Sequence, residues 1–293
     1  MRSLTEYESS EEHWAWHLIR PGIGILLWPG GGNLSFELGY RLLLRFFEED
    51  FVADRNNKMS HDIRFINSWK IAPKTALIFK GNFSPIVYFG DDTFNNDSMP
   101  VRGLVGIQGL FTPRFGLSLF AGYGASFYEA GEQFSHVIAT GQLMFFVAPT
   151  ANIKLGGQRD FVDSFYSNFF IKNGGYIKYE QMFGGIVLAT LKGDIFHRDY
   201  STMAGSVSVN GGTPSSSDRS DIWAGGTLLI EWRAFDWLSF HVSGRYQGNI
   251  SDFAYQFEPT DNDNDPTTPD VSRPDLEVRF HRFQVFGGVR GHY

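Results

Sequence analysis

Alternation of apolar and polar residues over long segments is the feature of this sequence that most limits its fold. In Ser35–Phe47, every even-numbered residue from 36 to 46 is apolar or aromatic, whereas the odd-numbered positions include Glu37, Arg41 and Arg45. A repeat of two residues places one set on each face of a β-strand, and a helix would mix the two sets. This segment is therefore predicted to be an amphipathic strand.

The same alternation returns along the whole chain. Strands of a dozen or more residues are long for a soluble protein, where five or six is typical, and they suit a tilted strand that crosses a membrane. The clear further segments are Phe115–Phe127, Ile222–Arg233 and Leu238–Ile250, and the weaker ones are His61–Ile71, Thr75–Phe89, Val101–Phe111, Phe134–Val147, Ala151–Gln158, Asn168–Met182, Gly184–Phe196 and Leu276–Tyr293.

The connections between these segments are alternately short and long. Short ones carry tight-turn residues, as in Pro29–Gly32 and Ala72–Lys74, and between them lie polar loops such as Glu48–Ser60, Gly90–Pro100 and Ser251–Asp275. Short turns at one rim and long loops at the other are typical of outer-membrane β-barrels. We predict an all-β fold: one closed transmembrane antiparallel β-barrel of about 12 strands, with short periplasmic turns and long extracellular loops. The alternative is a soluble lipocalin-like barrel or β-sandwich, with a polar exterior and shorter strands.

The barrel is predicted to span residues 21–293, after an N-terminal extension of residues 1–20. The apolar stretch His13–Trp28 suggests one more strand, which would make the total odd. Ser9 and Glu12 have capping-box spacing, so a short amphipathic helix before Pro21 is the other interpretation of this extension. Residues 1–20 lack the basic start and apolar core of a signal peptide, and we expect a mature chain with an added Met1.

Charge is distributed unevenly between loops and strands. The formal net charge of −7 argues against nucleic acid as a partner. Most acids lie in the loops, whereas most bases lie on the polar faces of the strands. A charge that points into lipid costs roughly 2–4 kcal/mol at the bilayer midplane, so these bases should face the lumen. The predicted lumen-lining residues are Arg41, Arg45, Arg64, Lys80, Arg102, Arg233, Arg245 and Arg290.

A lumen lined by these bases should prefer anions. The alternative is that acids on the same faces pair with the bases and only stabilise the barrel interior. The acids that could do so are Glu37, Glu180, Asp194, Glu231 and Glu277.

No motif predicts catalysis or cofactor binding. The eight histidines are scattered without an HExxH spacing, no GxSxG is present, and there is no cysteine. We therefore predict no catalytic residue, no metal site and no cofactor. The loop Asp261–Asp265 resembles the start of a calcium loop, but Pro266 occupies the position where such a loop needs glycine, and we expect a disordered acidic loop.

Several groups of residues in Pro149–Phe253 carry a resemblance to a known family: Gln158-Arg159-Asp160 with Asp163-Ser164, Tyr179 and Gln181, Arg198-Asp199-Tyr200, Arg219 with Asp221, and Trp237-Leu238 leading to Ser251-Asp252-Phe253. With them the chain resembles outer-membrane β-barrel porins found with exopolysaccharide export systems. Ile19–Gly22 followed by Leu34–Phe46 is similar to that family's opening hairpin. The resemblance implies passage or export of polysaccharide.

These patterns predict an outer-membrane pore or export component with an anion-preferring lumen. Its expected partners are outer-membrane lipid, an anionic solute or polysaccharide, and other envelope proteins. Two alternatives stay open. One is a plugged structural or adhesive barrel that anchors an envelope complex. The other is a lipid-modifying enzyme, because enzymes of this kind exist on twelve-stranded barrels with sites built from adjacent strands.

Overall fold

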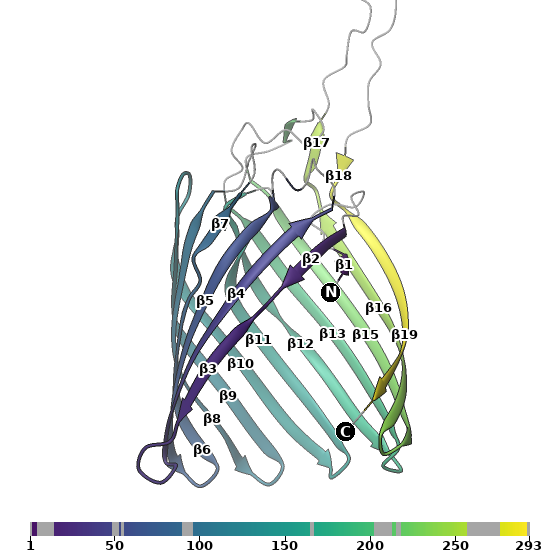
Figure 1. The fold of residues 1–293 in the computed structure, drawn as a ribbon. Coiled ribbons are helices and arrows are strands. Elements are labelled where there is room, and N and C mark those ends of the chain that lie inside the picture. The colour runs from purple at the N-terminus through teal and green to yellow at the C-terminus, as the bar shows by residue number, and fades with distance from the viewer. Residues whose placement is uncertain are drawn as a thin grey trace, which may run out of the picture.

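One antiparallel sheet contains most of the residues that the computed structural model describes, which are 2–4, 15–48, 53, 56–89, 96–164, 167–201, 213–214, 218–256 and 276–291. The sheet has 16 strands, and each long strand pairs with the long strands that precede and follow it in the chain. Figure 1 shows that this meander curls around a central axis. No helix of the described residues is long and apolar enough to cross a membrane.

The strands of the large sheet are β1 (Arg2–Leu4), β2 (Ala15–Ile19), β3 (Gly22–Leu27), β4 (Leu34–Phe47), β5 (Lys58–Ala72), β6 (Thr75–Phe83), β7 (Ile86–Tyr88), β8 (Ser98–Thr112), β9 (Phe115–Tyr128), β10 (Phe134–Ala148), β11 (Ala151–Asp163), β12 (Phe169–Phe183), β13 (Val187–Tyr200), β15 (Ser220–Phe235), β16 (Leu238–Ser251) and β19 (Phe280–Gly291). A separate three-stranded sheet consists of β14 (Thr213–Pro214), β17 (Ala254–Gln256) and β18 (Leu276–Glu277).

The connections at one end of the sheet have two to six residues and those at the other end have five or more, which agrees with the predicted alternation of short turns and longer loops. One end of the sheet, which we call the turn end, carries the connections 28–33, 73–74, 113–114, 149–150, 184–186 and 236–237. The other, the loop end, carries 48–57, 89–97, 129–133, 164–168, 201–219 and 252–279. The only register shifts within the long pairings fall beside the tight turns of the turn end, such as that between Lys70 and Ala72. Elsewhere the register continues without a slip. A slip of one residue would move every side chain of the strand to the opposite face of the sheet.

The predicted strands from Leu34 onward are confirmed, and they form twelve long strands, in agreement with the prediction. Two details were wrong. Leu276–Tyr293 is not one strand, because Leu276–Glu277 forms β18 of the separate sheet and β19 begins at Phe280. Thr75–Phe89 is not one strand either. Pro85 has no N–H to donate to the ladder, so the strand is interrupted between β6 and β7. The carbonyl oxygen of Pro85 still takes part in the pairing, because it accepts a hydrogen bond from the backbone N–H of His61 at 3.0 Å.

Before Leu34, a further interrupted strand precedes the twelve. β2 and β3 both pair with β4, and Pro21 lies between them. Ala15–Ile19 is therefore a strand rather than a helix, whereas Ser9 and Glu12 of the proposed capping box lie outside the described residues. The turn from β3 to β4 contains Gly30, Gly31 and Gly32 with φ angles of 67°, 79° and 89°, a conformation that favours glycine.

The strand pairing does not close on itself among the described residues. β19 pairs with β16 alone, β3 pairs with β4 alone, and the short β1 pairs with β2 alone. The predicted closed ring of strands is thus not formed by these pairings. They form one antiparallel meander with two outer edges. One edge lies at the interrupted strand before Leu34 and the other at β19, and the pairings among the described residues do not join them.

Candidate functional site on the concave face

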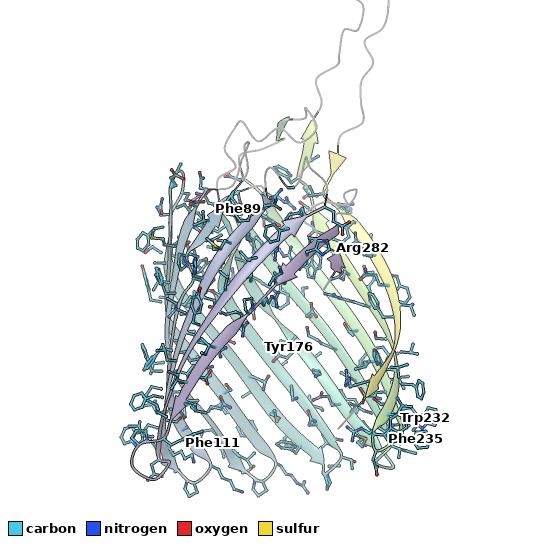
Figure 2. The ribbon with its side chains drawn as sticks, in the orientation of Figure 1. Phe89, Phe111, Tyr176, Trp232, Phe235 and Arg282 are labelled. Carbon is cyan, nitrogen blue, oxygen red and sulfur yellow. The ribbon has the colours of Figure 1, made fainter. Side chains whose placement is uncertain are left out.

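The two faces of the sheet differ in whether their side chains converge. Arg102 of β8 donates from Nε to Oδ1 of Asp160 of β11 at 3.0 Å, across two intervening strands. The hydroxyl of Tyr176 of β12 donates to Oε1 of Gln142 of β10 at 2.6 Å, across β11. Side chains can meet across an intervening strand only on the inside of a curved sheet. We call this face the concave face; Tyr176, which lies on it, is labelled in Figure 2. The opposite face, which carries Leu119, is called the convex face.

All eight bases predicted to line a lumen lie on the concave face. Contacts across the curve show this for three of them. Besides Arg102, Nζ of Lys80 lies 3.5 Å from the ring centroid of Phe120, across β8. Nη1 of Arg290 donates to Oε2 of Glu231 at 2.8 Å, across β16.

The strand register places the other five on the same face. Arg233 lies two residues from Glu231, and Arg245 lies four from His241, the register partner of Glu231. The remaining three lie on β4 and β5. Arg64 pairs with Asn82, two residues from Lys80. Arg41 and Arg45 pair with the residues two and six positions before Arg64.

Acids on the concave face pair with about half of these bases. Nη2 of Arg64 lies 2.7 Å from Oε1 of Glu37, and Glu231 contacts both Arg290 and Arg233, the latter at 3.9 Å. Lys154 and Lys178 both contact Glu180, and Lys192 contacts Asp194. Among the acids expected to pair with bases, only Glu277 has a side chain outside the described residues. The positive charge of the concave face is therefore partly neutralised.

Three of the predicted bases have no acidic partner in the described part of the chain. Arg41, Lys80 and Arg245 have no carboxylate oxygen within 4.0 Å of their charged nitrogens there. Arg45 lies over the Trp16 ring, 4.7 Å from the centroid. Sequence reasoning could not separate the bases that have an acidic partner from those without one, because pairing depends on the register between strands.

At the loop end, the concave face is packed with aromatic residues. Tyr128, Phe134, Ile138, Phe161 and Phe169 form one buried cluster. The rings of Phe134 and Phe161 stack with centroids 4.1 Å apart, and the guanidinium of Arg102 lies 3.9 Å from the centroid of Phe161. Sequence reasoning missed this cluster, because its members come from four different strands, β9 to β12.

A second buried group at the loop end contains an ion pair. Nη2 of Arg219 lies 2.7 Å from Oδ2 of Asp221, and neither side chain is exposed to solvent. Nδ2 of Asn249 also donates to this carboxylate, at 3.1 Å, and the guanidinium of Arg219 lies 4.2 Å from the ring centroid of Tyr200. Arg219 and Asp221 belong to the residues that carry the family resemblance, but the sequence did not reveal that they are buried together.

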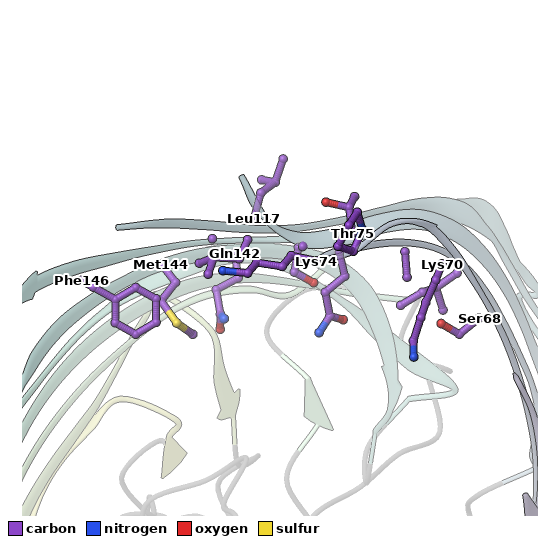
Figure 3. A pocket seen from close by; sticks show the side chains of 16 residues that line it. Ser68, Lys70, Lys74, Thr75, Leu117, Gln142, Met144 and Phe146 are labelled. Atoms are coloured by element: carbon purple, nitrogen blue, oxygen red, sulfur yellow. The ribbon is translucent and has the colours of Figure 1, made fainter. Parts of the chain in front are cut away.

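At the turn end, the same face is open. A hollow of about 450 Å³ lies over the ends of β5, β6, β8, β9 and β10. Figure 3 shows the side chains of Lys70, Gln142 and Met144 extending to the concave side of the strands, whereas Leu117 points to the opposite side. The lining combines two lysines with amide, hydroxyl and apolar groups and is suited to contact a hydrated solute.

The convex face is covered with large apolar side chains that have no partner in the structure. Leu119, Leu191, Ile195 and Val242 are 52%, 58%, 58% and 60% exposed. Near the turn end, aromatic residues gather on this face, and Phe111, Trp232 and Phe235 mark them in Figure 2. A soluble protein would bury such residues, so this face is suited to a nonaqueous environment.

Polar pairs also lie on the convex face towards the loop end, and exposed apolar residues such as Met99 and Phe127 continue beyond them. Tyr40 hydrogen-bonds His61, Tyr123 hydrogen-bonds Ser135, and Tyr246 hydrogen-bonds His281. On β9 the apolar side chains of this face extend from Phe115 to Phe127. At roughly 3.4 Å per residue and a tilt of about 40°, these twelve residue steps correspond to about 31 Å along the axis, enough for the roughly 25 Å apolar band of outer-membrane barrels.

No protein-family model matches this chain, and a comparison with curated proteins found no similar sequence. The resemblance to porins of exopolysaccharide export systems therefore stays a prediction.

Proposed function

We propose that this chain is a transmembrane β-barrel of an outer membrane and that its concave face lines a solute path. The observation that carries this proposal is the exposed apolar convex face, which has aromatic residues near the turn end. Strands are suited to such a crossing because they satisfy their backbone hydrogen bonds with neighbouring strands. The even alternation of short turns and longer loops supports the same topology.

We further propose that the barrel acts as a pore or export component. The open turn end, with Lys70, Gln108, Ser118 and Gln142 at its wall, supports contact with hydrated or anionic solutes. Amide and hydroxyl groups can hydrogen-bond the hydroxyls of a sugar, and the resemblance suggests polysaccharide as the solute. Polysaccharide as the solute is the most specific part of the proposal, and it depends on the family resemblance alone.

The packing of the loop end favours a second candidate, a plugged structural barrel. If the buried clusters around Phe134 and Arg219 close the path completely, the barrel would anchor an envelope complex instead of conducting. Single-channel recordings in planar bilayers separate the two candidates. Discrete conductance steps support the pore, and silent bilayers with folded protein support the structural barrel.

Two adjacent substitutions test the membrane topology itself. Leu119→Arg puts a charge on the convex face, and Ser118→Arg puts the same charge on the concave face of the same strand. The first should destabilise the protein folded in lipid vesicles by roughly 2–4 kcal/mol, and the second by much less. Stability is measured by denaturant unfolding, with heat-modifiable gel migration as the signal. Equal effects of the two arginines, or a wild-type chain that stays soluble and monomeric without detergent, would refute the membrane assignment.

A further inference from the structure

One base of the long strands does not follow the distribution of the others. The lysines and arginines of the described long strands lie on the concave face, with the single exception of Arg159 of β11. Leu155, four residues before Arg159, is 53% exposed on the convex face, and the even separation puts Arg159 on that face too. Its register partner Ala139 agrees, because Ala139 lies two residues from Val137, which is 59% exposed. A positive charge thus lies on the apolar face of the sheet.

Along its strand, Arg159 lies towards the loop end. β11 begins after the connection 149–150 at the turn end and ends at Asp163, four residues beyond Arg159. A charged side chain on the lipid face is costly at the bilayer midplane and costs little near the interfaces, where it reaches headgroups and water. Under the proposed membrane function, on which this step rests, Arg159 faces the headgroup region of the leaflet on the loop side.

Two hydrogen bonds hold the guanidinium of Arg159 in place. Nε donates to the carbonyl oxygen of Val137 at 3.3 Å, and Nη1 donates to Oδ1 of Asn173 at 2.8 Å. A guanidinium has five N–H groups. The second N–H of Nη1 and both N–H groups of Nη2 therefore have no acceptor among the described residues. Because Arg159 is exposed, a ligand on the convex face can reach them.

No acid of the described residues forms an ion pair with Arg159. No carboxylate oxygen there lies within 4.0 Å of its charged nitrogens. Asp160, the next residue, binds Arg102 instead. Asp199 lies on β13, on the far side of β12, and its Oδ2 contacts Nδ1 of His197 at 3.3 Å. An anionic group from outside the described residues would therefore stabilise Arg159 on this apolar face.

The surroundings of Arg159 indicate the chemistry of that anion. The planar guanidinium matches the oxygens of a phosphate group, which accept two parallel hydrogen bonds from it. Leu155 and its register partner Ile177, which is 54% exposed, provide apolar surface on the turn-end side of Arg159. A free phosphate ion would gain nothing from this surface, whereas a lipid would place its acyl chains there. We propose that Arg159 binds the phosphate group of a membrane lipid and that Asn173 positions the guanidinium for it.

Lipid binding by the detergent-folded protein tests this assignment. Native mass spectrometry measures the affinity for phosphatidic acid, which carries a phosphate monoester, and for phosphatidylcholine with the same acyl chains, whose phosphate is balanced by choline. Arg159→Gln removes the charge from the convex face. Arg282→Gln is the matched control, because Arg282 lies near the loop end but on the concave face, where it pairs in register with Gln247 (Figure 2). Heat-modifiable gel migration shows whether each variant is folded.

Arg159→Gln should weaken the binding of phosphatidic acid at least about tenfold, because charge-assisted hydrogen bonds to the phosphate are lost. Arg282→Gln should leave it nearly unchanged, and neither variant should alter the binding of phosphatidylcholine. Asn173→Ala keeps the charge but releases Nη1, and it should weaken the binding of phosphatidic acid about threefold. This second variant tests the site even if Arg159→Gln does not fold.

Unchanged affinity of Arg159→Gln or of Asn173→Ala for phosphatidic acid would overturn the inference. Equal losses for Arg159→Gln and Arg282→Gln would do the same, because they would show unspecific attraction by the net charge. Displacement of phosphatidic acid by an equal concentration of inorganic phosphate would show a site for free anions instead of a lipid. The contrast between Leu119→Arg and Ser118→Arg reports on the membrane barrel independently. A failed lipid test with an intact contrast would therefore refute the lipid site and leave the proposed function standing.

Discussion

The loop end and the turn end of the concave face are built from the same strands but differ in packing. On β9, Ser126 near the loop end is completely buried, whereas Ser118 near the turn end lines the open hollow. Both serines occupy the same face and are separated by an even number of residues. Alternation thus decides which face a residue occupies, while the volume of the neighbouring side chains decides whether that part of the face is closed. At the loop end those neighbours are aromatic rings such as Phe134 and Phe161.

The largest expected contrast between the two ends concerns stability. Phe134 is 1% exposed within the loop-end cluster, whereas Phe146 lies beside the turn-end hollow and is only partly buried. Phe134→Ala should reduce the free energy of unfolding by about 3–5 kcal/mol, and Phe146→Ala should cost clearly less, because its site can fill with water. Denaturant unfolding in lipid vesicles measures both. Equal losses would show that the two ends are packed alike.

Charge pairs should show the next largest contrast. Asp221→Asn leaves the buried Arg219 uncompensated and should cost roughly 3–5 kcal/mol, and replacing both partners with Met and Leu should recover part of this loss. Glu37→Gln breaks the ion pair between Glu37 and Arg64, whose side chains are 35% and 44% exposed, respectively. It should reduce the free energy of unfolding by less than about 1 kcal/mol. The same unfolding assay applies. A double variant as unstable as Asp221→Asn would contradict the explanation based on an uncompensated charge.

The sequence was sufficient to predict features that depend on local pattern. The alternation in Ser35–Phe47 and Phe115–Phe127 identified strands and faces correctly, and the Pro- and Gly-containing turns identified the turn end. The interruption at Pro85 was missed, although proline gives a local signal for it. The loop-end cluster and the pair of Arg219 with Asp221 could not be predicted, because they depend on which strands lie side by side and at what register. The two outer edges of the sheet are of the same kind, since they follow from the number of strands and the pairing of all of them together.

Chemical accessibility is a more direct probe of the same contrast. Ser118→Cys and Ser126→Cys introduce nearly isosteric thiols on the same face of β9. A charged, membrane-impermeant thiol reagent should modify Ser118→Cys at least about tenfold faster, because reaction at position 126 requires local opening of the packed loop end. The time course of labelling by mass spectrometry gives both rates. Similar rates would mean that the loop end opens readily and would favour the pore over the plugged barrel.

The smallest expected effect concerns ion selectivity, and it depends on which bases are paired. If the barrel conducts, Arg245→Ser removes a base that has no acidic partner among the described residues and should lower the preference for anions. Arg41→Ser should act in the same direction. Glu37→Gln should act in the opposite direction, because it releases the charge of Arg64 into the lumen. Reversal potentials under a salt gradient measure all three variants against the unchanged protein.

The opposite signs make this test specific for the lumen charge. Variants that merely distort the barrel would shift the reversal potential without regard to the sign of the removed charge. The shifts should also shrink as salt rises, because the screening length falls from about 10 Å at 0.1 M to about 3 Å at 1 M. Shifts of the same sign for Arg245→Ser and Glu37→Gln would disprove control by the mid-strand charges. Selectivity would then be assigned to the packed loop end, where Arg102 and Arg198 lie against aromatic rings.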